Sequence, residues 1–385
     1  MPFRAGRLTA AHDVTLALGG LFAMAAGIGI GRFIYTPILP PMVEALGLSK
    51  SSAGLIASAN FIGYLIGALF AAYAHLPGSR RTWLLGSLAV STVTTGWMGF
   101  TDWVPAFLVL RLAGGVASAL ILILASALVL EQLAQSGRTA LTGVHFAGVG
   151  IGIAVSAGAV AAVQAGGMAW PALWLTGAAL SLVATILVWL LIPDPGVKAQ
   201  QMADAGGTQT SRGLRMMIGA YGLFGFGYVI TATFIVSIVR AAPAVRPLEP
   251  IIWIVVGLSA APSLALWTWL ADRIGVQASF GLAAVAEAIG VMASVAWQST
   301  IGILAAAILL GGTFMGLTAL GLMRARALSA GDPRQAIAKL TGSFGVGQII
   351  GPVFAGMLYD YSGSFALPSY VAAAGLVVAA ILAQR

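Results

Sequence analysis

The sequence contains no cysteine, and only 8% of its 385 residues are charged. Without thiols, neither disulfide bonds nor cysteine nucleophiles contribute to its stability or its chemistry. Soluble domains carry roughly 25% charged residues because their surfaces face water, and this chain has far fewer. Its composition is 59% hydrophobic with a mean hydropathy of +0.98, which predicts an integral membrane protein.

Features of ATP-driven pumps and of hydrolytic or metal-dependent enzymes are missing as well. No Gly-rich phosphate-binding loop occurs, which argues against ATP as the energy source. The three histidines, His12, His75 and His145, are far apart, so no metal site is predicted. No serine, histidine and aspartate have the spacing of a hydrolase triad. We therefore predict neither a cofactor nor an enzymatic activity.

Long apolar runs make up most of the chain. A helix needs about 20 apolar residues to cross roughly 30 Å of hydrocarbon, and continuous rather than alternating runs favour helices over a barrel. A polar stretch, 193–213, separates six runs from six more. The predicted spans are 14–40, 52–74, 82–100, 104–130, 141–163, 170–192, 214–240, 250–270, 277–297, 301–323, 337–358 and 364–383. We therefore predict an all-α protein of twelve transmembrane helices in two six-helix bundles, 1–192 and 214–385, joined by a cytoplasmic linker.

The positions of lysine and arginine predict the orientation. With the N-terminus inside, fourteen of the 19 basic residues fall in cytoplasmic segments, three in outer loops and two within spans. The inner group is Arg4, Arg7, Arg80, Arg81, Arg138, Lys198, Arg212, Arg215, Arg273, Arg324, Arg326, Arg334, Lys339 and Arg385, and the outer group is Lys50, Arg240 and Arg246. This bias follows the positive-inside rule. It places both termini in the cytoplasm and accounts for the net charge of +8 without a nucleic-acid partner. No small-residue cleavage site follows residues 1–13, which favours an uncleaved first span over a signal peptide.

The two halves repeat a motif. The fifth predicted span opens with "LTGVHFAGVG" (141–150) and the eleventh with "LTGSFGVG" (340–347), each after a basic inner loop. Six-helix halves in tandem are typical of transporters that hold their substrate between the halves near the membrane midplane. The repeat therefore indicates a transporter with two pseudo-symmetric halves.

Three further motifs resemble those of the major facilitator superfamily: "WLADRIG" (269–275), "RLAGGVASA" (111–119) and "GQIIGPVFAG" (347–356). The stretches "GIGRFIYTPILPPM" (29–42) and "YGLFGFGYVITATF" (221–234) are similar to the bacterial YbfB/YjiJ-like branch. This resemblance implies the major facilitator fold, a monomer in the bacterial inner membrane, and a cytoplasmic gate that uses Asp272 and Arg273. A solvated turn is the alternative for that loop.

Two departures from the superfamily pattern limit the resemblance. The inner-loop signature normally recurs after the second span, but "GALFAAYAHLPGSRR" (67–81) has no aspartate there, although Arg80 and Arg81 remain. The Gly-Pro motif marks the fifth span of drug/proton antiporters, and this fifth span has no proline. The second departure weakens an antiport interpretation.

Two arginines, Arg32 and Arg111, lie within predicted spans. A charged side chain at mid-bilayer costs at least ~2.5–3.5 kcal/mol, and arginine does not lose its proton to avoid that cost. At 1.5 Å per residue, both lie roughly 27–28 Å above the inner face. We predict that the two guanidinium groups share a site for a carboxylate, phosphate or sulfonate. As alternatives, Arg32 extends to the outer headgroups, and Arg111 bonds carbonyls of a kinked neighbour or pairs with Asp102.

Other polar residues within the spans are candidates for substrate binding or proton coupling. Tyr35, Asn60, Tyr228 and Gln348 are predicted to bind substrate with the arginines, and Tyr64 is a further candidate to line the cavity. Glu287 and His145 are candidates for proton coupling because ionisable groups inside a membrane are costly to bury and often have a function. The alternatives are a neutral Glu287 bonded to a neighbouring helix, and a His145 that packs within a small-residue stripe.

The combined prediction is a secondary active transporter that moves a small organic anion by alternating access, with proton symport left open. A proton-driven multidrug or metabolite exporter is the alternative, since ten tryptophans and sixteen phenylalanines would suit amphipathic substrates. The predicted partners are an anionic small molecule, protons in the coupled version, and the lipid bilayer.

Overall fold

The computed structural model describes residues 2–73, 77–194, 211–329 and 333–385, and in these ranges every regular element is a helix. His75, Lys198 and most of the predicted linker 193–213 lie outside the described residues. The helices fall into two groups, which we name the N-terminal group (α1–α7) and the C-terminal group (α8–α14).

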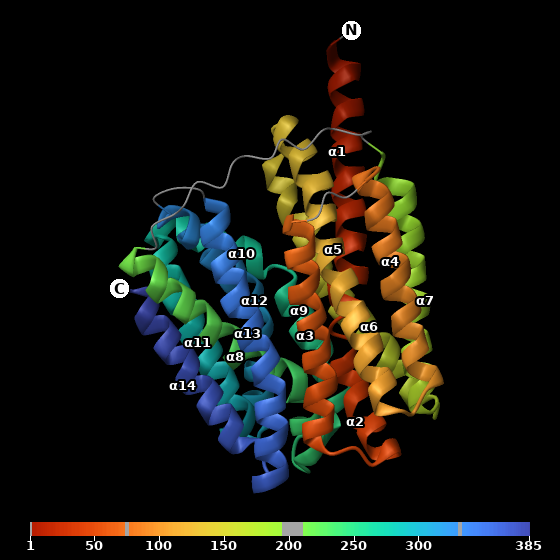
Figure 1. Cartoon of the computed structure of the whole chain (residues 1–385), viewed down its shortest axis with the longest axis vertical. Coiled ribbons are helices and arrows are strands. Elements are labelled where there is room, and N and C mark those ends of the chain that lie inside the picture. Colours follow the sequence, from red (N-terminus) through yellow and green to blue (C-terminus); the bar gives the residue numbers. More distant parts are fainter. Residues whose placement is uncertain (1, 74–76, 195–210, 330–332) are drawn as a thin grey trace.

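The N-terminal group contains seven α-helices and three short helical segments. Its elements are α1 (Pro2–Met24), the π-helix η1 (Ala25–Ile30), α2 (Tyr35–Leu46), α3 (Lys50–Tyr73), α4 (Arg80–Trp97), η2 (Met98–Phe100), α5 (Val104–Gln135), η3 (Thr139–Leu141), α6 (Thr142–Ala165) and α7 (Trp170–Leu191). Together α1, η1 and α2 form the first predicted span, interrupted near its middle (Figure 1).

The C-terminal group repeats this plan. Its elements are α8 (Arg212–Ala241), η4 (Arg246–Leu248), α9 (Glu249–Ala260), α10 (Ser263–Ile274), α11 (Val276–Ala296), α12 (Thr300–Ala327), α13 (Pro333–Ser362) and α14 (Ala366–Ala383). The helices α9 and α10 are bent by 42° at a short break and together correspond to the eighth predicted span.

Packing within the two groups is equivalent, as the internal repeat predicts. In the N-terminal group α1 packs on α6, α3 on α5, and α4 on α7. In the C-terminal group α8 packs on α13, the α9–α10 pair on α12, and α11 on α14. The predicted architecture of two pseudo-symmetric helical bundles is therefore confirmed.

The helices also have the length and apolar surface that a membrane requires. Ten are long and apolar enough to cross a bilayer, or eleven if the bent pair is counted as one span, among the described residues. The predicted third span, α4, is not in this set; its 18 residues include Arg80, Arg81 and several serines and threonines. Large apolar side chains on α7, such as Val183 and Trp189, are exposed and fit a lipid-facing surface. The protein is thus a multi-pass membrane protein, and the count of twelve spans stays a prediction.

Serine side chains mark where three of these helices begin. Ser79, Ser211 and Ser299 each accept a hydrogen bond from a backbone N–H in the first turn of α4, α8 and α12. Such caps satisfy amide groups that a helix start leaves without an internal partner. These local sequence signals explain why the three boundaries lie close to those predicted from hydropathy.

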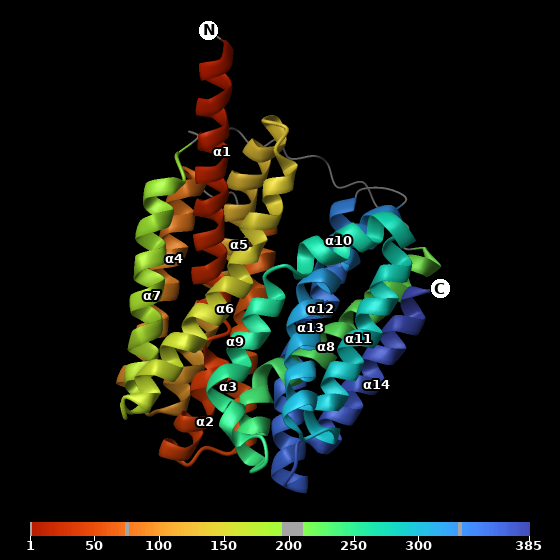
Figure 2. The same cartoon turned by 180° about the vertical axis from the view of Figure 1, so that it is seen from behind.

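The two groups meet along α3 with α13 and along α6 with α9. Figure 2 shows the groups converging where α2 and α3 join and diverging toward the end that carries the N-terminus. We call the converging side, where residues 46–50, 241–249 and 362–366 lie, the α2 end. At that end glycine residues let the backbones of α3 and α13 come into direct contact. A Cβ on Gly54 would lie 2.1 Å from the Pro352 carbonyl oxygen, and one on Gly356 would lie 2.2 Å from that of Lys50.

Candidate substrate-binding site

The first span is interrupted at the residues that precede α2. In the π-helical segment Ala25–Ile30 the hydrogen bonds lengthen by one residue, so that the Gly31 N–H donates to the Ala26 carbonyl at 2.8 Å. The Thr36 N–H, which would reach the Arg32 carbonyl in a regular helix, donates to Phe33 at 3.2 Å instead. Such π segments are frequent at functional sites. This interruption places Arg32 between the two groups of helices.

Arg111 on α5 supports this interruption. Its Nη1 and Nη2 atoms donate to the carbonyl oxygens of Gly31 and Arg32, each at 3.1 Å. The side chain is 4% exposed, and its guanidinium carbon lies 5.1 Å from the centre of the Tyr35 ring. The two arginines therefore do come together, as their predicted depths require. In this structure Arg111 bonds the carbonyls of a kinked neighbour, so a direct role in substrate binding stays a prediction.

Arg32 connects the two groups. Its Nη2 atom donates to Oε1 of Gln348 on α13 at 2.9 Å, and the Gln348 amide donates in turn to the Tyr228 hydroxyl on α8. All three side chains are buried, with Arg32 6% exposed. Three of the predicted substrate-binding residues, from three different spans, thus form one hydrogen-bonded chain.

Aromatic rings rather than carboxylates surround the Arg32 guanidinium group. Its central carbon lies 4.5 Å from the centre of the Tyr64 ring, 4.6 Å from Phe61 and 5.6 Å from Phe33. No carboxylate oxygen lies within 4.0 Å of the Arg32 or Arg111 guanidinium group in the part of the chain that the structure describes. Ring faces stabilise a cation but do not neutralise its charge. The site therefore keeps a net positive charge.

Tyr35 and Asn60 lie beside the arginines and bond the backbone. The Tyr35 hydroxyl donates to the Ala53 carbonyl at 2.8 Å, and the Asn60 amide donates to the Arg111 carbonyl at 3.0 Å. The Asn60 Oδ1 atom is buried and has no hydrogen-bond partner. Contact of Tyr35 and Asn60 with substrate stays a prediction. Their observed hydrogen bonds join α3 to α2 and to α5, next to the two arginines.

The two proton-coupling candidates occupy different places. Glu287 on α11 is fully buried, and neither of its carboxyl oxygens meets the geometry of a hydrogen bond, although Thr313 of α12 interacts with it. His145 on α6 is also fully buried, with Nε2 3.2 Å from the Ser126 hydroxyl. A Cβ on Gly148 in the same stripe would lie 2.1 Å from the Leu21 carbonyl oxygen, so this stripe packs closely against α1. Neither proton role is tested by these contacts.

The predicted gate residues Asp272 and Arg273 are exposed at the end of α10. The Arg273 guanidinium carbon lies 3.9 Å from the centre of the Trp269 ring on its own helix. In the N-terminal group, Arg80 pairs with Glu131 at 3.0 Å, and Arg81 donates to the carbonyls of Trp189 and Ile192. A gate at this end stays a prediction for a conformation in which the two groups close there.

Comparison with known proteins identifies the family. A model described as "Uncharacterised MFS-type transporter YbfB" matches residues 24–384. The chain belongs to this family of major facilitator transporters. The recognition made from the motifs is therefore confirmed.

Solved structures share the fold of this transporter. A variant of the nucleoside transporter NupG matches 96% of the chain and 99% of its own, with a TM-score of 0.77 and 16% identity. A bacterial homologue of the human lysosomal transporter Spinster, in an inward-facing and unoccupied conformation, matches 97% of the chain and 96% of its own, with a TM-score of 0.69 and 14% identity. At these identities the likeness establishes the fold and not the substrate.

A curated relative of the transporter is the gallate transporter of Pseudomonas putida, at 28% identity over 158 residues. The match covers 41% of this chain and 35% of that protein. It therefore concerns only part of either molecule.

The transporter also makes contacts at the α2 end that the sequence analysis did not predict. Glu44 of α2 pairs with Arg240 of α8 at 2.9 Å, and Arg240 also pairs with Glu249 at 2.7 Å. Asp360 of α13 accepts hydrogen bonds from the backbone N–H groups of Lys50 and Ser51 at the start of α3, at 3.0 and 2.9 Å. The Glu44–Arg240 pair and the Asp360 hydrogen bonds join the N-terminal group to the C-terminal group. The Arg240–Glu249 pair lies within the C-terminal group.

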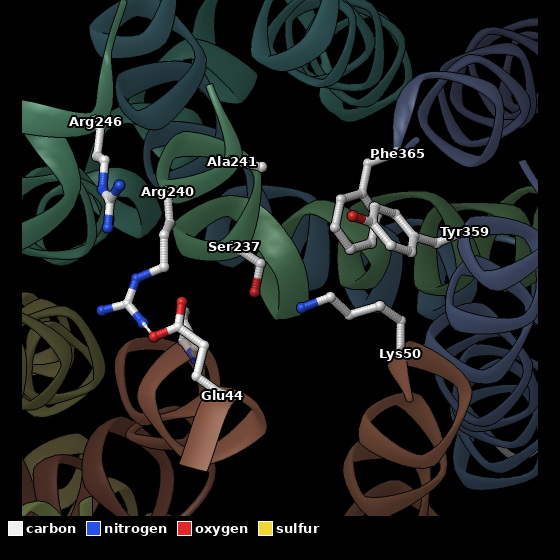
Figure 3. Close-up of a pocket in the computed structure, with 9 residues that line it drawn as sticks. Glu44, Lys50, Ser237, Arg240, Ala241, Arg246, Tyr359 and Phe365 are labelled. Atoms are coloured by element: carbon white, nitrogen blue, oxygen red, sulfur yellow. Dashed lines mark ion pairs between the residues drawn. The ribbon is translucent and has the colours of Figure 1, made fainter. Parts of the chain in front are cut away.

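A cavity of about 180 Å³ lies among these contacts (Figure 3). Its lining includes Glu44, Lys50, Ser237, Arg240 and Tyr359. In Figure 3 the Lys50 side chain extends across the cavity toward Ser237, below the rings of Tyr359 and Phe365. The outer basic residues were assigned to loops from the sequence, and a pairing between distant loops has no local signal.

One aromatic residue at Arg32, Phe61, was also not proposed as a site residue, whereas Tyr64 was a candidate to line the cavity. Phe61 and Tyr64 are three positions apart on α3, a spacing that places them on one face of a helix. This spacing was visible in the sequence. What the sequence does not contain is the contact of that face with Arg32.

Proposed function

We propose that this protein is a secondary active transporter of a small organic anion and that Arg32 binds the anion. One observation carries the proposal: the Arg32 guanidinium group is buried, faces no carboxylate among the described residues, and bonds a neutral amide of the opposite group. Buried charges are normally paired, because leaving one unpaired is costly. A substrate carboxylate would supply the missing negative charge with charge-assisted hydrogen bonds.

The Arg32–Gln348 hydrogen bond suggests how binding would be linked to movement. It joins the N-terminal group to the C-terminal group at 2.9 Å. An anion that takes the place of the Gln348 oxygen would replace a direct contact between the groups with one through the substrate. Rocking of two halves about a midplane site exposes that site to each side in turn. In this proposal the substrate changes the balance between the two conformations by binding them unequally.

The orientation and coupling belong to the same proposal. With both termini in the cytoplasm of a bacterial inner membrane, the α2 end faces outward and the groups diverge toward the cytoplasm. Glu287 remains the candidate for a coupled proton, since it is fully buried within a predicted span. The gallate transporter supports an organic anion as the substrate, within the limited region that it matches.

Counterflow in proteoliposomes tests the function. Purified protein would be reconstituted into vesicles loaded with unlabelled gallate or succinate, and uptake of the same labelled anion would be measured. We expect uptake at least tenfold above empty vesicles for one of these anions, and none for the cation ethidium. Ethidium counterflow without anion counterflow would instead support the multidrug exporter.

The contacts at the α2 end give a second expected result. Glu44→Gln combined with Asp360→Asn removes one partly exposed ion pair and one helix-end carboxylate, each worth at most about 1–1.5 kcal/mol. We expect the outward-open conformation to gain population by about three- to tenfold, since both contacts join the two groups. Because the chain has no cysteine, Ser237→Cys introduces a single thiol, and its labelling by a membrane-impermeant maleimide measures opening at this end.

The matched control is Arg80→Gln with the same thiol. It breaks the Arg80–Glu131 pair, which lies within the N-terminal group. The rate of labelling should not change in this control. Equal labelling in the double variant and the unmodified protein would mean that these contacts do not hold the α2 end closed.

A further inference from the structure

We infer that the transported anion carries an aromatic ring, so that the substrate class is a benzoate-type aromatic carboxylate. This inference rests on the proposed function, because it assigns the rest of the substrate whose carboxylate binds Arg32. It is carried by the rings that surround the guanidinium group and by the mutual hydrogen bonding of Gln348 and Tyr228 beside it.

The first observation is that three aromatic rings lie close to the Arg32 guanidinium group. Phe61 and Tyr64 come from α3, and Phe33 follows Arg32 in the chain. Phe33 in turn lies edge-on to Phe314 of α12, with ring centres 5.9 Å apart, and 6.2 Å from Trp253 of α9. The positive charge thus lies at one edge of an aromatic surface that both groups of helices build.

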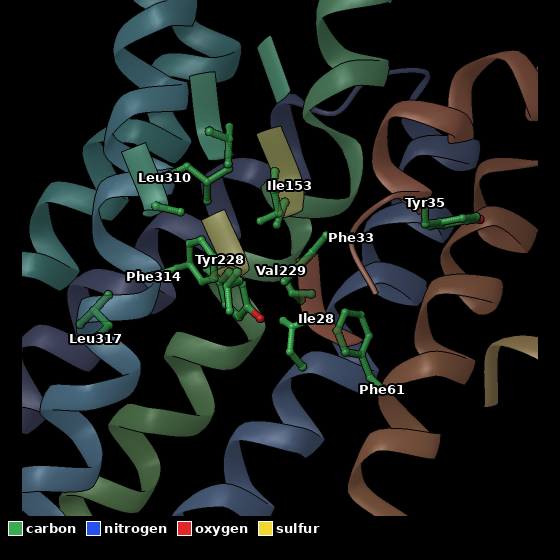
Figure 4. Close-up of a cluster of buried hydrophobic side chains, with 14 of the residues drawn as sticks. Ile28, Phe33, Tyr35, Phe61, Ile153, Tyr228, Val229, Leu310, Phe314 and Leu317 are labelled. Carbon is green, nitrogen blue, oxygen red and sulfur yellow. The ribbon is translucent and has the colours of Figure 1, made fainter. Parts of the chain in front are cut away.

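The second observation is a parallel stack beside Arg32. The Tyr228 ring lies 5.8 Å from Phe314 at 2° and 5.9 Å from Phe344 at 4°, so the three ring planes are nearly parallel. Figure 4 shows the Tyr228 hydroxyl pointing toward Ile28 and Phe61. That hydroxyl accepts from Gln348, which also bonds Arg32. The stack and the cation are therefore two hydrogen bonds apart.

The solvent-exposed fraction of each aromatic residue distinguishes those that can contact a substrate from those that cannot. Phe33 and Phe314 are each 6% exposed and Phe344 is 8% exposed, whereas the neighbouring Phe224 is 0% exposed. Water-sized space thus reaches part of each of the first three residues and no part of Phe224. A substrate ring with its carboxylate on Arg32 would lie against these rings in the stacked or edge-on arrangements that aromatic pairs favour.

Gln348 and Tyr228, the polar side chains that link to Arg32, are already engaged with one another. Gln348 and Tyr228 bond each other, and Gln348 accepts from Arg32. A polyhydroxylated aliphatic acid would leave most of its hydroxyl groups against apolar ring surface, which is costly when they lack partners. A flat aromatic body avoids that cost and gains ring contacts. The chemistry of the site therefore favours an aromatic acid over a sugar acid.

Benzoate and cyclohexanecarboxylate form the matched test. Both are monocarboxylates on a six-carbon ring, and they differ in the π system. Counterflow of each labelled acid and its thermal stabilisation of the purified protein would be measured. One well-placed ring pair discriminates by up to about tenfold, so we expect benzoate to bind about three- to tenfold more tightly.

Variants on a single helix locate the discrimination. Phe344→Leu on α13 should bring the ratio of the two affinities close to one, because it removes a ring of the parallel stack. Phe354→Leu on the same helix is the control, since Phe354 pairs with Phe226, 5.4 Å away, outside the stack. If Phe344→Leu does not fold, Phe314→Leu removes the other ring that stacks on Tyr228 and tests the same point.

The outcomes separate this inference from the proposed function. Equal affinity for the two acids, or counterflow of succinate without benzoate, would overturn the aromatic substrate and leave the anion transporter intact. Absence of binding and counterflow for every anion would overturn both. A benzoate preference that persists in Phe344→Leu and Phe314→Leu would overturn the assignment of these rings.

Discussion

Arg32→Gln is expected to abolish anion counterflow while the protein stays folded. The variant removes the cation that bonds the Gln348–Tyr228 chain, and its neutral amide offers the substrate no charge. Hydrogen bonds to charged groups are worth about 1.5–3 kcal/mol each, so losing two would reduce affinity by roughly 100-fold or more. Counterflow at several substrate concentrations measures the loss, and thermal unfolding of the purified variant checks the fold.

Two further variants show whether the Arg32→Gln result comes from the guanidinium group itself. Arg32→Lys should recover little counterflow, because an ammonium group does not reproduce the planar fork that matches a carboxylate. Arg80→Gln serves as the control, since Arg80 pairs with Glu131 away from the site, and its counterflow should equal that of the unmodified protein. Normal counterflow in Arg32→Gln would remove the basis of the anion proposal.

Arg111→Gln is expected to lower stability as well as counterflow. Arg111 donates to two backbone carbonyl groups at the interruption of the first span, and a glutamine amide reaches at most one of them. A buried carbonyl group left without a donor costs about 1–3 kcal/mol. The free energy of unfolding should therefore fall by roughly that amount, and Arg32 should lose its position. Thermal or chemical unfolding in detergent gives the first quantity and counterflow the second.

Comparison of the two arginine variants distinguishes a positioning role from a binding role. Arg32→Gln should lose anion binding with little change in thermal stability, whereas Arg111→Gln should lose both. If Arg111→Gln keeps its full stability and loses only anion binding, Arg111 contacts the substrate directly. That result would favour the shared two-arginine site that the sequence predicts.

Much of the architecture could be predicted from local pattern, because lipid requires long apolar helices whose backbone groups are satisfied internally. The repeated LTG motif and the inner-loop motif around Asp272 also identified the fold and the superfamily. Arg32, Tyr228 and Gln348 stood out as polar residues inside apolar runs. These signals depend only on neighbouring residues, which is why sequence reasoning finds them.

The contacts between these residues could not be predicted in the same way. Arg32 and Gln348 are 316 positions apart, and their hydrogen bond depends on how two groups of helices pack. The direction of the Arg111 side chain depends on a π-helical interruption for which residues 25–30, AAGIGI, show no distinct marker. The pairing of Glu44 with Arg240 joins two distant segments that both read as loop or helix end. Tertiary packing decides each of these features.

The approach of α3 to α13 has a physical consequence for closure at the α2 end. Where Gly54 faces the Pro352 carbonyl and Gly356 faces that of Lys50, the helices touch through their main chains. Dissolved ions weaken attraction between exposed charges, but they leave the fit of two bare backbones unchanged. The contact between α3 and α13 should therefore close the α2 end equally well in dilute and in concentrated electrolyte. The α2 end then stays closed to solutes when the surrounding ionic strength changes.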